Sequence, residues 1–464
     1  MTGHRKKIYA RTGDRQAFLL YETKELDDAP RPAGRGRIPI GIKELSARFP
    51  KMPIGKALVE ETLRRLEPVP AFAVMLLRLD DFFSLRQAAG DEAAISLLLD
   101  AAVVVDEGCR AGGGFWGVIE QDLIGVFLPE QTESDARDLA EEIRQVFSQV
   151  RGETLTAGIT EYPLADYGRL DTLKNARKAL LHARFLGPGG IAAFDAVSLN
   201  ISADRLFQEG NIHGAAEELK AALKMNPADA DIRNSLGVCY ASLGALHAAL
   251  REFKTAAGLR REGIMPVHNI GLVHEMMGDP EKALMHLIEA DRLLEAGRDA
   301  EDVFELPYQI GRIYLQEGLP EKAEPYLVRA AALNPASGAA WRKLGECLLA
   351  RGDIHGAAAA FGSAVKSNPS DAASLSELGI LFHRKGENPE IALLFCRHSI
   401  EISPRNGTYR QNLGKLCLAM NRLDEALAAF QRAHDLGCDS RAYIDRIRGS
   451  LSPSEEISQK KETA

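Results

Sequence analysis

Apolar and polar positions follow a helical period through the second half of the chain, and the pattern repeats. Six copies carry an apolar residue followed by glycine, with 34, 40, 34, 34 and 35 residues between successive glycines. The pairs are Leu236-Gly237, Ile270-Gly271, Ile310-Gly311, Leu344-Gly345, Leu378-Gly379 and Leu413-Gly414. Five of the copies have another glycine seven residues later, and prolines close several units. Each unit therefore predicts two helices of about 12–14 residues, the first ended by a glycine.

One such helix pair cannot bury its apolar face alone, so the units must stack on each other. Seven units are predicted over residues 196–440, starting at Ala196, Ala230, Ile264, Phe304, Gly338, Ala372 and Gly407. The 40-residue spacing predicts an insertion near residues 298–303, and residues 441–464 predict a capping helix followed by a disordered tail. The recurring residues resemble the tetratricopeptide repeat family. That resemblance implies an all-α solenoid that binds a partner protein or peptide.

Strand and helix patterns alternate in the region before the repeats. Apolar runs predict strands at 72–79, 154–160 and 191–194 and a hairpin at 115–128. Helical patterns follow the first strand to about residue 109 and occupy 132–150 and 171–185. Thr132 and Asp135 have the spacing of a capping box. Residues 67–195 therefore predict an α/β domain with a mixed sheet, after an N-terminal extension at 1–66 that contains a linker at 24–37 and ends in a helix at 55–66.

Several segments of this domain resemble the diguanylate cyclase (GGDEF) family. They are LLRLDDFFSL at 76–85, FLP at 127–129, LTAGIT at 155–160 and NARKALLHARFLG at 175–187. The resemblance implies a GGDEF-like fold over about 125 residues. The signature pentapeptide of the family falls on residues 120–124, EQDLI, which lack both glycines. The first metal-binding aspartate of the family falls on Arg78.

Only Asp80, Glu120 and Asp122 remain of the acidic residues that the resemblance would place in a nucleotide site. A cation at position 78 repels Mg²⁺, and long side chains in place of the glycines crowd the nucleotide. The Arg-x-x-Asp motif through which the family binds cyclic di-GMP is also missing at 111–114. We therefore expect a degenerate domain with no catalytic residue, no metal and no cofactor.

The tetratricopeptide resemblance also implies where a partner binds, because repeat positions 2, 5, 6, 9 and 12 of the first helix line the peptide groove in that family. In this chain, amides and cations occupy many of these positions, and such groups can bind the backbone and carboxylates of an extended peptide. The predicted partner-binding residues are Asn234, Asn269, Arg312, Arg342 and Lys415. Taken singly, each is also consistent with a solvated helix face.

Composition narrows the classes of function. The 464 residues are 45% hydrophobic and 26% charged, as in ordinary globular proteins. With 57 basic and 65 acidic residues, the net charge is −8, which argues against a nucleic-acid partner. The six cysteines form no CxxC pair and indicate packing rather than metal binding. No apolar run reaches the roughly 20 residues of a membrane-spanning helix, and the polar N-terminus predicts a cytoplasmic protein.

Two functions remain open. The first is a non-catalytic scaffold or adaptor, which the resemblance would place in bacterial signalling. In this interpretation the α/β domain is a regulatory or dimerising module, and the protein could form a homodimer. The second is a nucleotide-responsive pseudo-enzyme that binds GTP or cyclic di-GMP without turnover. The missing glycines, metal ligand and Arg-x-x-Asp motif favour the scaffold. No flexible spacer separates the domains at 195–199, which predicts that they share packing.

Overall fold

The computed structural model describes residues 7–9, 19–21, 40–54, 56–260, 263–296 and 304–451. The predicted linker at 24–37, the insertion at 298–303 and the tail at 452–464 lie outside these residues. The chain divides into two compact units, one ending at Asn269 and one beginning at Ile270. The domain limits predicted from the sequence stay predictions.

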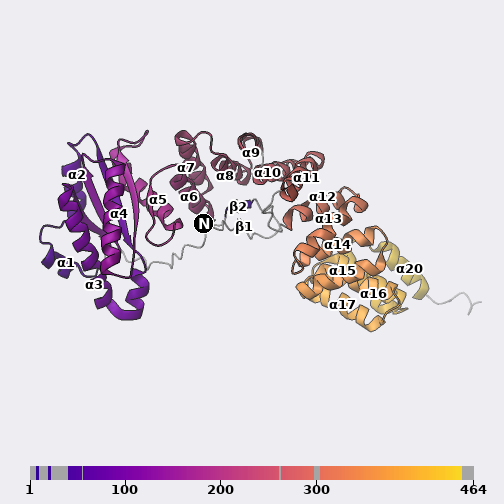
Figure 1. Ribbon diagram of the computed structural model, residues 1–464. Coiled ribbons are helices and arrows are strands. Elements are labelled where there is room, and N and C mark those ends of the chain that lie inside the picture. The colour runs from indigo at the N-terminus through magenta and orange to yellow at the C-terminus, as the bar shows by residue number, and fades with distance from the viewer. Residues whose placement is uncertain are drawn as a thin grey trace, which may run out of the picture. The chain divides into compact units, whose positions relative to one another are not determined.

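A mixed five-stranded sheet forms the centre of the α/β region (Figure 1). Its strand order is β4 (Phe115–Glu120), β5 (Leu123–Pro129), β3 (Phe72–Leu79), β6 (Leu155–Tyr162) and β7 (Ile191–Ala193). Strand β3 is antiparallel to both β5 and β6, whereas β7 is parallel to β6. A separate antiparallel pair joins β1 (Lys7–Tyr9) to β2 (Leu19–Tyr21). The predicted mixed sheet is confirmed.

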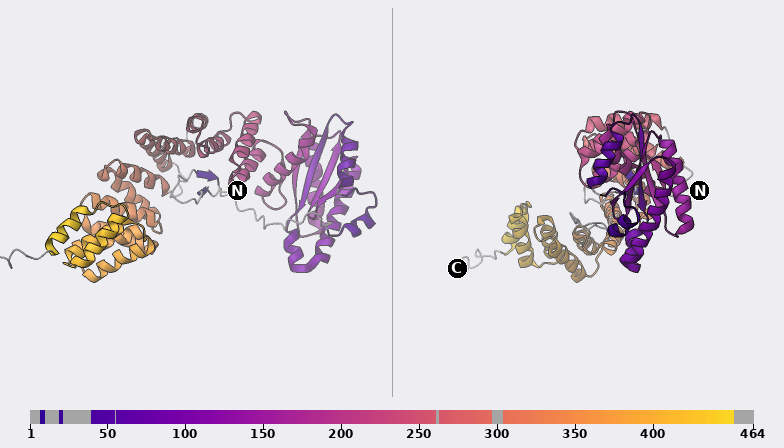
Figure 2. Two further views of the ribbon diagram at one scale, coloured as in Figure 1. Left: turned by 180° about the vertical axis from the view of Figure 1, so that it is seen from behind. Right: turned by 90° about the vertical axis from the view of Figure 1, so that its left-hand side faces the viewer.

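The two faces of the sheet bury alternate residues of β3, as strand geometry requires. Ala73, Met75 and Leu77 belong to the core that includes α3 (Phe82–Ala111), α4 (Glu133–Val150) and α1 (Ile42–Arg48). On the opposite face, residues such as Phe72 and Val74 pack with α2 (Lys56–Leu66) and α5 (Thr172–Phe185). Figure 2 shows the sheet from behind, with helices on both sides.

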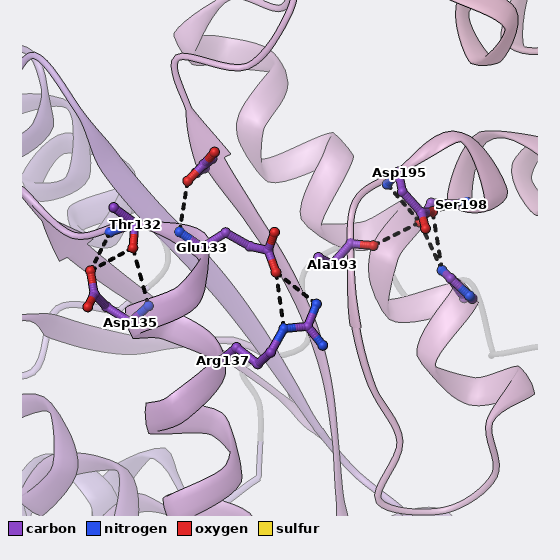
Figure 3. A network of polar contacts seen from close by, with 9 residues as sticks. Thr132, Glu133, Asp135, Arg137, Ala193, Asp195 and Ser198 are labelled. Carbon is purple, nitrogen blue, oxygen red and sulfur yellow. Dashed lines mark hydrogen bonds and ion pairs between the residues drawn. The ribbon is translucent and has the colours of Figure 1, made fainter. Parts of the chain in front are cut away.

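Local sequence signals explain several boundaries of these elements. Thr132 caps α4, because its side chain accepts from the Asp135 backbone while the Asp135 carboxylate accepts from the Thr132 backbone (Figure 3). Gly158 lets α5 lie directly on β6, since a Cβ atom there would stand 2.2 Å from the Leu180 nitrogen. The helix predicted after β3 differs from expectation, because Gly90 breaks it with φ 87° and ψ 177°. Glycine adopts this conformation without the cost that a Cβ imposes.

In the described residues, seven helical pairs follow the sheet, and the start of each first helix agrees with the predicted start to within one residue. The pairs are α6 (Ala196–Gln208) and α7 (Ile212–Met225), α8 (Ala230–Ser242) and α9 (Leu246–Leu259), α10 (Ile264–Met276) and α11 (Pro280–Ala296), α12 (Glu305–Gln316) and α13 (Pro320–Leu333), α14 (Gly338–Ala350) and α15 (Ile354–Ser367), α16 (Ala372–Arg384) and α17 (Pro389–Ile402), and α18 (Gly407–Ala419) and α19 (Leu423–Asp435). Helix α20 (Arg441–Leu451) follows them. Helix α11 has 17 residues where α9 has 14, so a longer second helix accompanies the 40-residue spacing.

The repeated glycines have two physical roles. The glycine within six of the seven first helices allows close helix approach, and α6 has Ala203 in its place: a Cβ on Gly237 would lie 2.5 Å from the Phe253 ring. The glycine after each first helix takes a left-handed conformation, as Gly244 does with φ 76°. In the last copy Asn421 takes this place with φ 56°, which asparagine tolerates better than most residues.

Candidate functional site

The predicted nucleotide site brings Glu120 and Asp122 together with an arginine. Arg78, the penultimate residue of β3, lies with Nη2 3.6 Å from Glu120 Oε2 and Nε 3.3 Å from Asp122 Oδ2. Arg177 of α5 forms a second ion pair with Glu120, at 2.7 Å. Asp122 is only 4% exposed. Both carboxylates are therefore balanced by arginines of the protein itself, in a place where a metal would need them free.

Asp80 has a different role from the one predicted. Its carboxylate accepts hydrogen bonds from Thr154 Oγ1 at 2.6 Å, Thr156 Oγ1 at 2.8 Å and the Gly189 backbone at 2.9 Å. These bonds tie the end of β3 to β6 and to the loop before β7. Within the described residues, no three His, Cys, Asp or Glu side chains gather as a metal site would require.

Asn234 and Asn269 lie together, but they do not line an open groove. Asn269 Nδ2 donates to Asn234 Oδ1 at 3.0 Å, and the residues are 0% and 4% exposed respectively. They join α8 to α10, the first helices of two neighbouring repeats. The structure thus gives them a role between repeats rather than the partner contact expected from the sequence, because a buried amide offers no surface to a peptide.

The same junction recurs near the end of the array. Asn412 of α18 donates through Nδ2 to Ser376 Oγ of α16 at 3.0 Å and to Glu377 Oε1 at 3.4 Å. In both places the residue at repeat position 6 donates to the residue at position 5 of the preceding repeat. This spacing is the sequence signal that would have identified the pair.

Two further titratable residues lie on first helices of repeats, in the same compact part of the chain as Asn234. His268 is 1% exposed, neither of its ring nitrogens has a hydrogen-bond partner among the described residues, and burial lowers its pKa to about 4. Asp204 of α6 is half-buried, and desolvation raises its pKa to about 7. Both residues stand at repeat positions that line the groove in the resembled family, but neither was among the five residues predicted to bind a partner.

Arg312 and Arg342 are both paired with an acidic residue of a neighbouring repeat. Arg312 forms an ion pair with Glu275 of α10 and donates to Gln309. Arg342 of α14 lies 3.2 Å from the carboxylate of Asp371, which caps the N-terminus of α16. These two cations therefore link successive repeats, and less of their charge is available to a partner than the sequence suggested.

A cavity of about 440 Å³ opens where α14, α16 and α18 adjoin, and Arg342, Glu346, Glu377 and Tyr409 all line it. Burial raises the pKa of the Glu377 carboxyl and the nearby charge of Glu346 raises it further, whereas the bond from Asn412 and the charge of Lys415 oppose the shift. With Arg342 committed to Asp371, the cavity presents acidic groups beside an aromatic ring.

Lys415 does not line this cavity itself, although its charge lies near enough to Glu377 to lower the pKa of that carboxyl. It lines another of about 480 Å³ together with Tyr443, Arg446 and residues of α18 and α19, next to α20. The five predicted residues therefore do not form one site. Asn234 and Asn269 form a buried pair, Arg312 and Arg342 form ion pairs between repeats, and Lys415 lies in the last repeat.

Known proteins are similar to this chain in the region of the helical pairs. The tetratricopeptide repeat model matches residues 202–263, 308–361 and 348–406. The BBSome complex member BBS4 of Bos taurus is 25% identical over 222 residues, which is 48% of this chain and 41% of that protein. The chain thus spans well under half the length of this curated relative.

Solved structures with repeats of this kind are also similar. YrrB, described as a tetratricopeptide repeat protein with an unusual peptide-binding site, is 24% identical, with 45% of this chain and 99% of that chain covered and a TM-score of 0.37. A tetratricopeptide repeat protein from Parabacteroides merdae is 22% identical, with 54% and 96% covered and a TM-score of 0.38. No helix in the described part of the chain is long and apolar enough to cross a membrane. The tetratricopeptide repeat model thus matches residues 202–263 and 308–406, and the observed helical pairs include these residues.

Proposed function

We propose that this chain is a non-catalytic scaffold that binds a partner protein through the first helices of its repeats. The observation that carries the proposal is the 440 Å³ cavity, where Glu346, Glu377 and Tyr409 come together from three successive first helices. A carboxylate whose pKa is raised by burial gains from a cationic partner. The partner segment is therefore expected to place a lysine or arginine there, beside the Tyr409 ring.

The relatives support an interaction role in general terms. BBS4 is by name a member of a complex, and YrrB is described as having a peptide-binding site. A role in bacterial signalling and binding of an extended peptide along the repeats are part of the proposal.

A photo-crosslinking amino acid at position 409 of the full-length protein tests the site. We expect it to capture a partner that the double variant Glu346→Lys/Glu377→Lys no longer captures, because two cations would repel the basic segment. Glu401→Lys, an exposed position on α17, is the matched control and should leave capture unchanged. Equal capture by the double variant would remove this cavity from the interface.

We also infer that the α/β domain is a degenerate diguanylate cyclase-like module that does not bind nucleotide. The support is the pair of arginines, Arg78 and Arg177, that neutralises Glu120 and Asp122. Calorimetric titration of the full-length protein with GTP and Mg²⁺, and separately with cyclic di-GMP, should give no saturable heat. Saturable binding would instead support the nucleotide-responsive pseudo-enzyme.

A further inference from the structure

Repeat positions 5, 9 and 12 of the first helices form a surface that we call the groove face. In α14 the residues at these positions are half-buried and line the 440 Å³ cavity, and they are Arg342, Glu346 and Leu349. In α8 the corresponding residues are only 4%, 0% and 2% exposed, and they are Asn234, Val238 and Ala241. The groove face is therefore open at α14 and covered at α8.

Neither side-chain size nor the neighbouring helices explain this difference. At position 9, Glu346, Ile380 and Lys415 are half-buried, whereas Val238 and Leu272 are 0% exposed. Leucine and isoleucine have the same size, so a smaller side chain is not the cause. The first helix of another repeat adjoins α8 on each side, as it does α14 and α16. The burial at α8 therefore indicates a further cover over this part of the groove face.

The strands β1 and β2 are a segment in need of a packing surface. They form a two-stranded sheet of their own, in which Ile8 lies opposite Leu20, and they belong to the same compact unit as α8. Five of their six residues, KIY and LLY, are aliphatic or aromatic. A lone two-stranded hairpin is at best marginally stable in water and needs a third strand or a helix to pack against. The groove face at α8 is a helical surface of this kind.

The charges of the two segments are complementary. The first 15 residues of the chain contain five arginines and lysines and one acidic residue, Asp14. Asp204 occupies position 9 of α6, and it lies near α8, because burial and the charge of Asp204 together raise the pKa of the Cys239 thiol. No cation among the described residues offsets the desolvation of Asp204. A basic segment over this part of the groove face would stabilise that carboxylate.

We propose that the β1–β2 hairpin of the same chain packs on the groove face of the first three repeats and covers Val238, Ala241 and His268. A partner that needs these repeats would have to displace the hairpin, so the N-terminal extension would limit access to them. The 440 Å³ cavity is formed by other first helices, and this inference therefore does not rest on the proposed partner site.

Photo-crosslinking in the full-length protein tests the contact. A benzophenone amino acid at position 8 should form crosslinks within one chain to peptides that contain residues 234–241 or 264–269, as identified by mass spectrometry. Val238→Lys should reduce these crosslinks, because the hairpin would have to bury the new charge. Leu394→Lys, at a 63% exposed position on α17, is the control and should leave them unchanged. Circular dichroism of both variants verifies that they fold.

A second measurement does not depend on the folding of Val238→Lys. His268 is 1% exposed, so diethyl pyrocarbonate should modify its ring slowly in the unaltered protein. Ile8→Asp/Leu20→Asp should release the hairpin and raise the rate of His268 modification several-fold. Ile391→Asp/Leu394→Asp adds the same charges at exposed positions on α17 and should leave His268 protected.

Three outcomes would overturn the proposal. Crosslinks confined to the α/β region would place the hairpin elsewhere. A crosslinked dimer on a denaturing gel would assign the cover to a second copy of the protein. An unchanged rate of His268 modification in Ile8→Asp/Leu20→Asp would show that the neighbouring helices alone bury this part of the groove face.

Discussion

Buried polar side chains on the first helices of the repeats are exceptions to an otherwise apolar core. Asn234 and Asn269 satisfy each other in part, since Asn269 Oδ1 remains without a partner among the described residues. His268 is buried with neither ring nitrogen hydrogen-bonded in that part of the chain. Such groups cost stability when their partners are lost, so single substitutions here should have measurable effects.

Asn269→Leu should lower the free energy of unfolding by about 1–3 kcal/mol, because Asn234 Oδ1 would stay buried without its donor. Asn234→Leu/Asn269→Leu should cost less than the sum of the single variants, since neither amide would remain unpaired. Urea unfolding of all four proteins, followed by circular dichroism, provides the comparison. Strictly additive losses would mean that the bond contributes nothing specific.

His268 should make the protein less stable as the pH falls. Its folded pKa of about 4 lies below the ordinary value of 6.5, so between these values the unfolded state binds the proton and the folded state does not. From pH 7 to pH 5 this costs about 2 kcal/mol. Asp204 acts in the opposite direction, because its raised pKa favours the folded state as the pH falls.

The matched variants are therefore His268→Leu and Asp204→Asn, each compared with the unaltered protein in urea at pH 7 and pH 5. The two effects nearly cancel in the unaltered protein, so relative to it His268→Leu should gain stability on acidification and Asp204→Asn should lose stability. The same slope in all three proteins would contradict both assignments.

At the scale of elements, six of the seven described repeats depend on a close crossing of two helices at a glycine. A Cβ on Gly379 of α16 would lie 2.3 Å from Cys396 Sγ and 2.8 Å from the Ala392 carbonyl of α17. The backbone contact leaves no flexible side chain to move aside. The crossing explains why an apolar residue and glycine recur with the period of the repeat.

Gly379→Ala should therefore destabilise the array by about 1–3 kcal/mol, because α16 and α17 must separate to admit the methyl group. Gly362→Ala in α15 is the control, since a Cβ there meets nothing within 4 Å. It should raise stability by about 0.5–1 kcal/mol through helix propensity. Thermal unfolding of the two variants checks the sign, and equal effects would contradict the packing role of Gly379.

At the scale of the molecule, the α/β region and the first repeat share one core. Ala179 of α5, Phe194 after β7 and Leu199 of α6 belong to the same apolar cluster. Asp195 caps α6 through Ser198 (Figure 3), and Lys178 of α5 pairs with Glu218 of α7 at 2.7 Å. This packing agrees with the shared core predicted from the missing spacer.

Phe194→Ala should weaken this junction by about 3–5 kcal/mol, because the ring is 5% exposed and packs edge-on against Tyr167. Limited proteolysis with a protease of broad specificity should then cut residues 186–200 faster than in the unaltered protein. Leu394→Ala, at an exposed position on α17, should not change that rate. Ready cleavage of the unaltered protein at 186–200 would contradict a shared core.

The amino-acid sequence by itself determined the elements whose signals are local. The first helices of the repeats, the strand β3, the cap at Thr132 and the helix α20 all agree with the predicted positions. Helical periodicity, capping residues and the seven-residue interval between the two glycines of a repeat act over fewer than ten residues, so they can be recognised without knowledge of the fold. The break at Gly90 was missed, because a glycine within a helical pattern often stays helical.

Tertiary structure alone decided how the candidate residues are used. Arg78 meets Glu120 and Asp122 only because β3 pairs with β5, and Asn234 meets Asn269 only because their repeats stack. Such contacts join residues that are tens of positions apart, and the sum of many weak packing energies, rather than any local motif, brings them together.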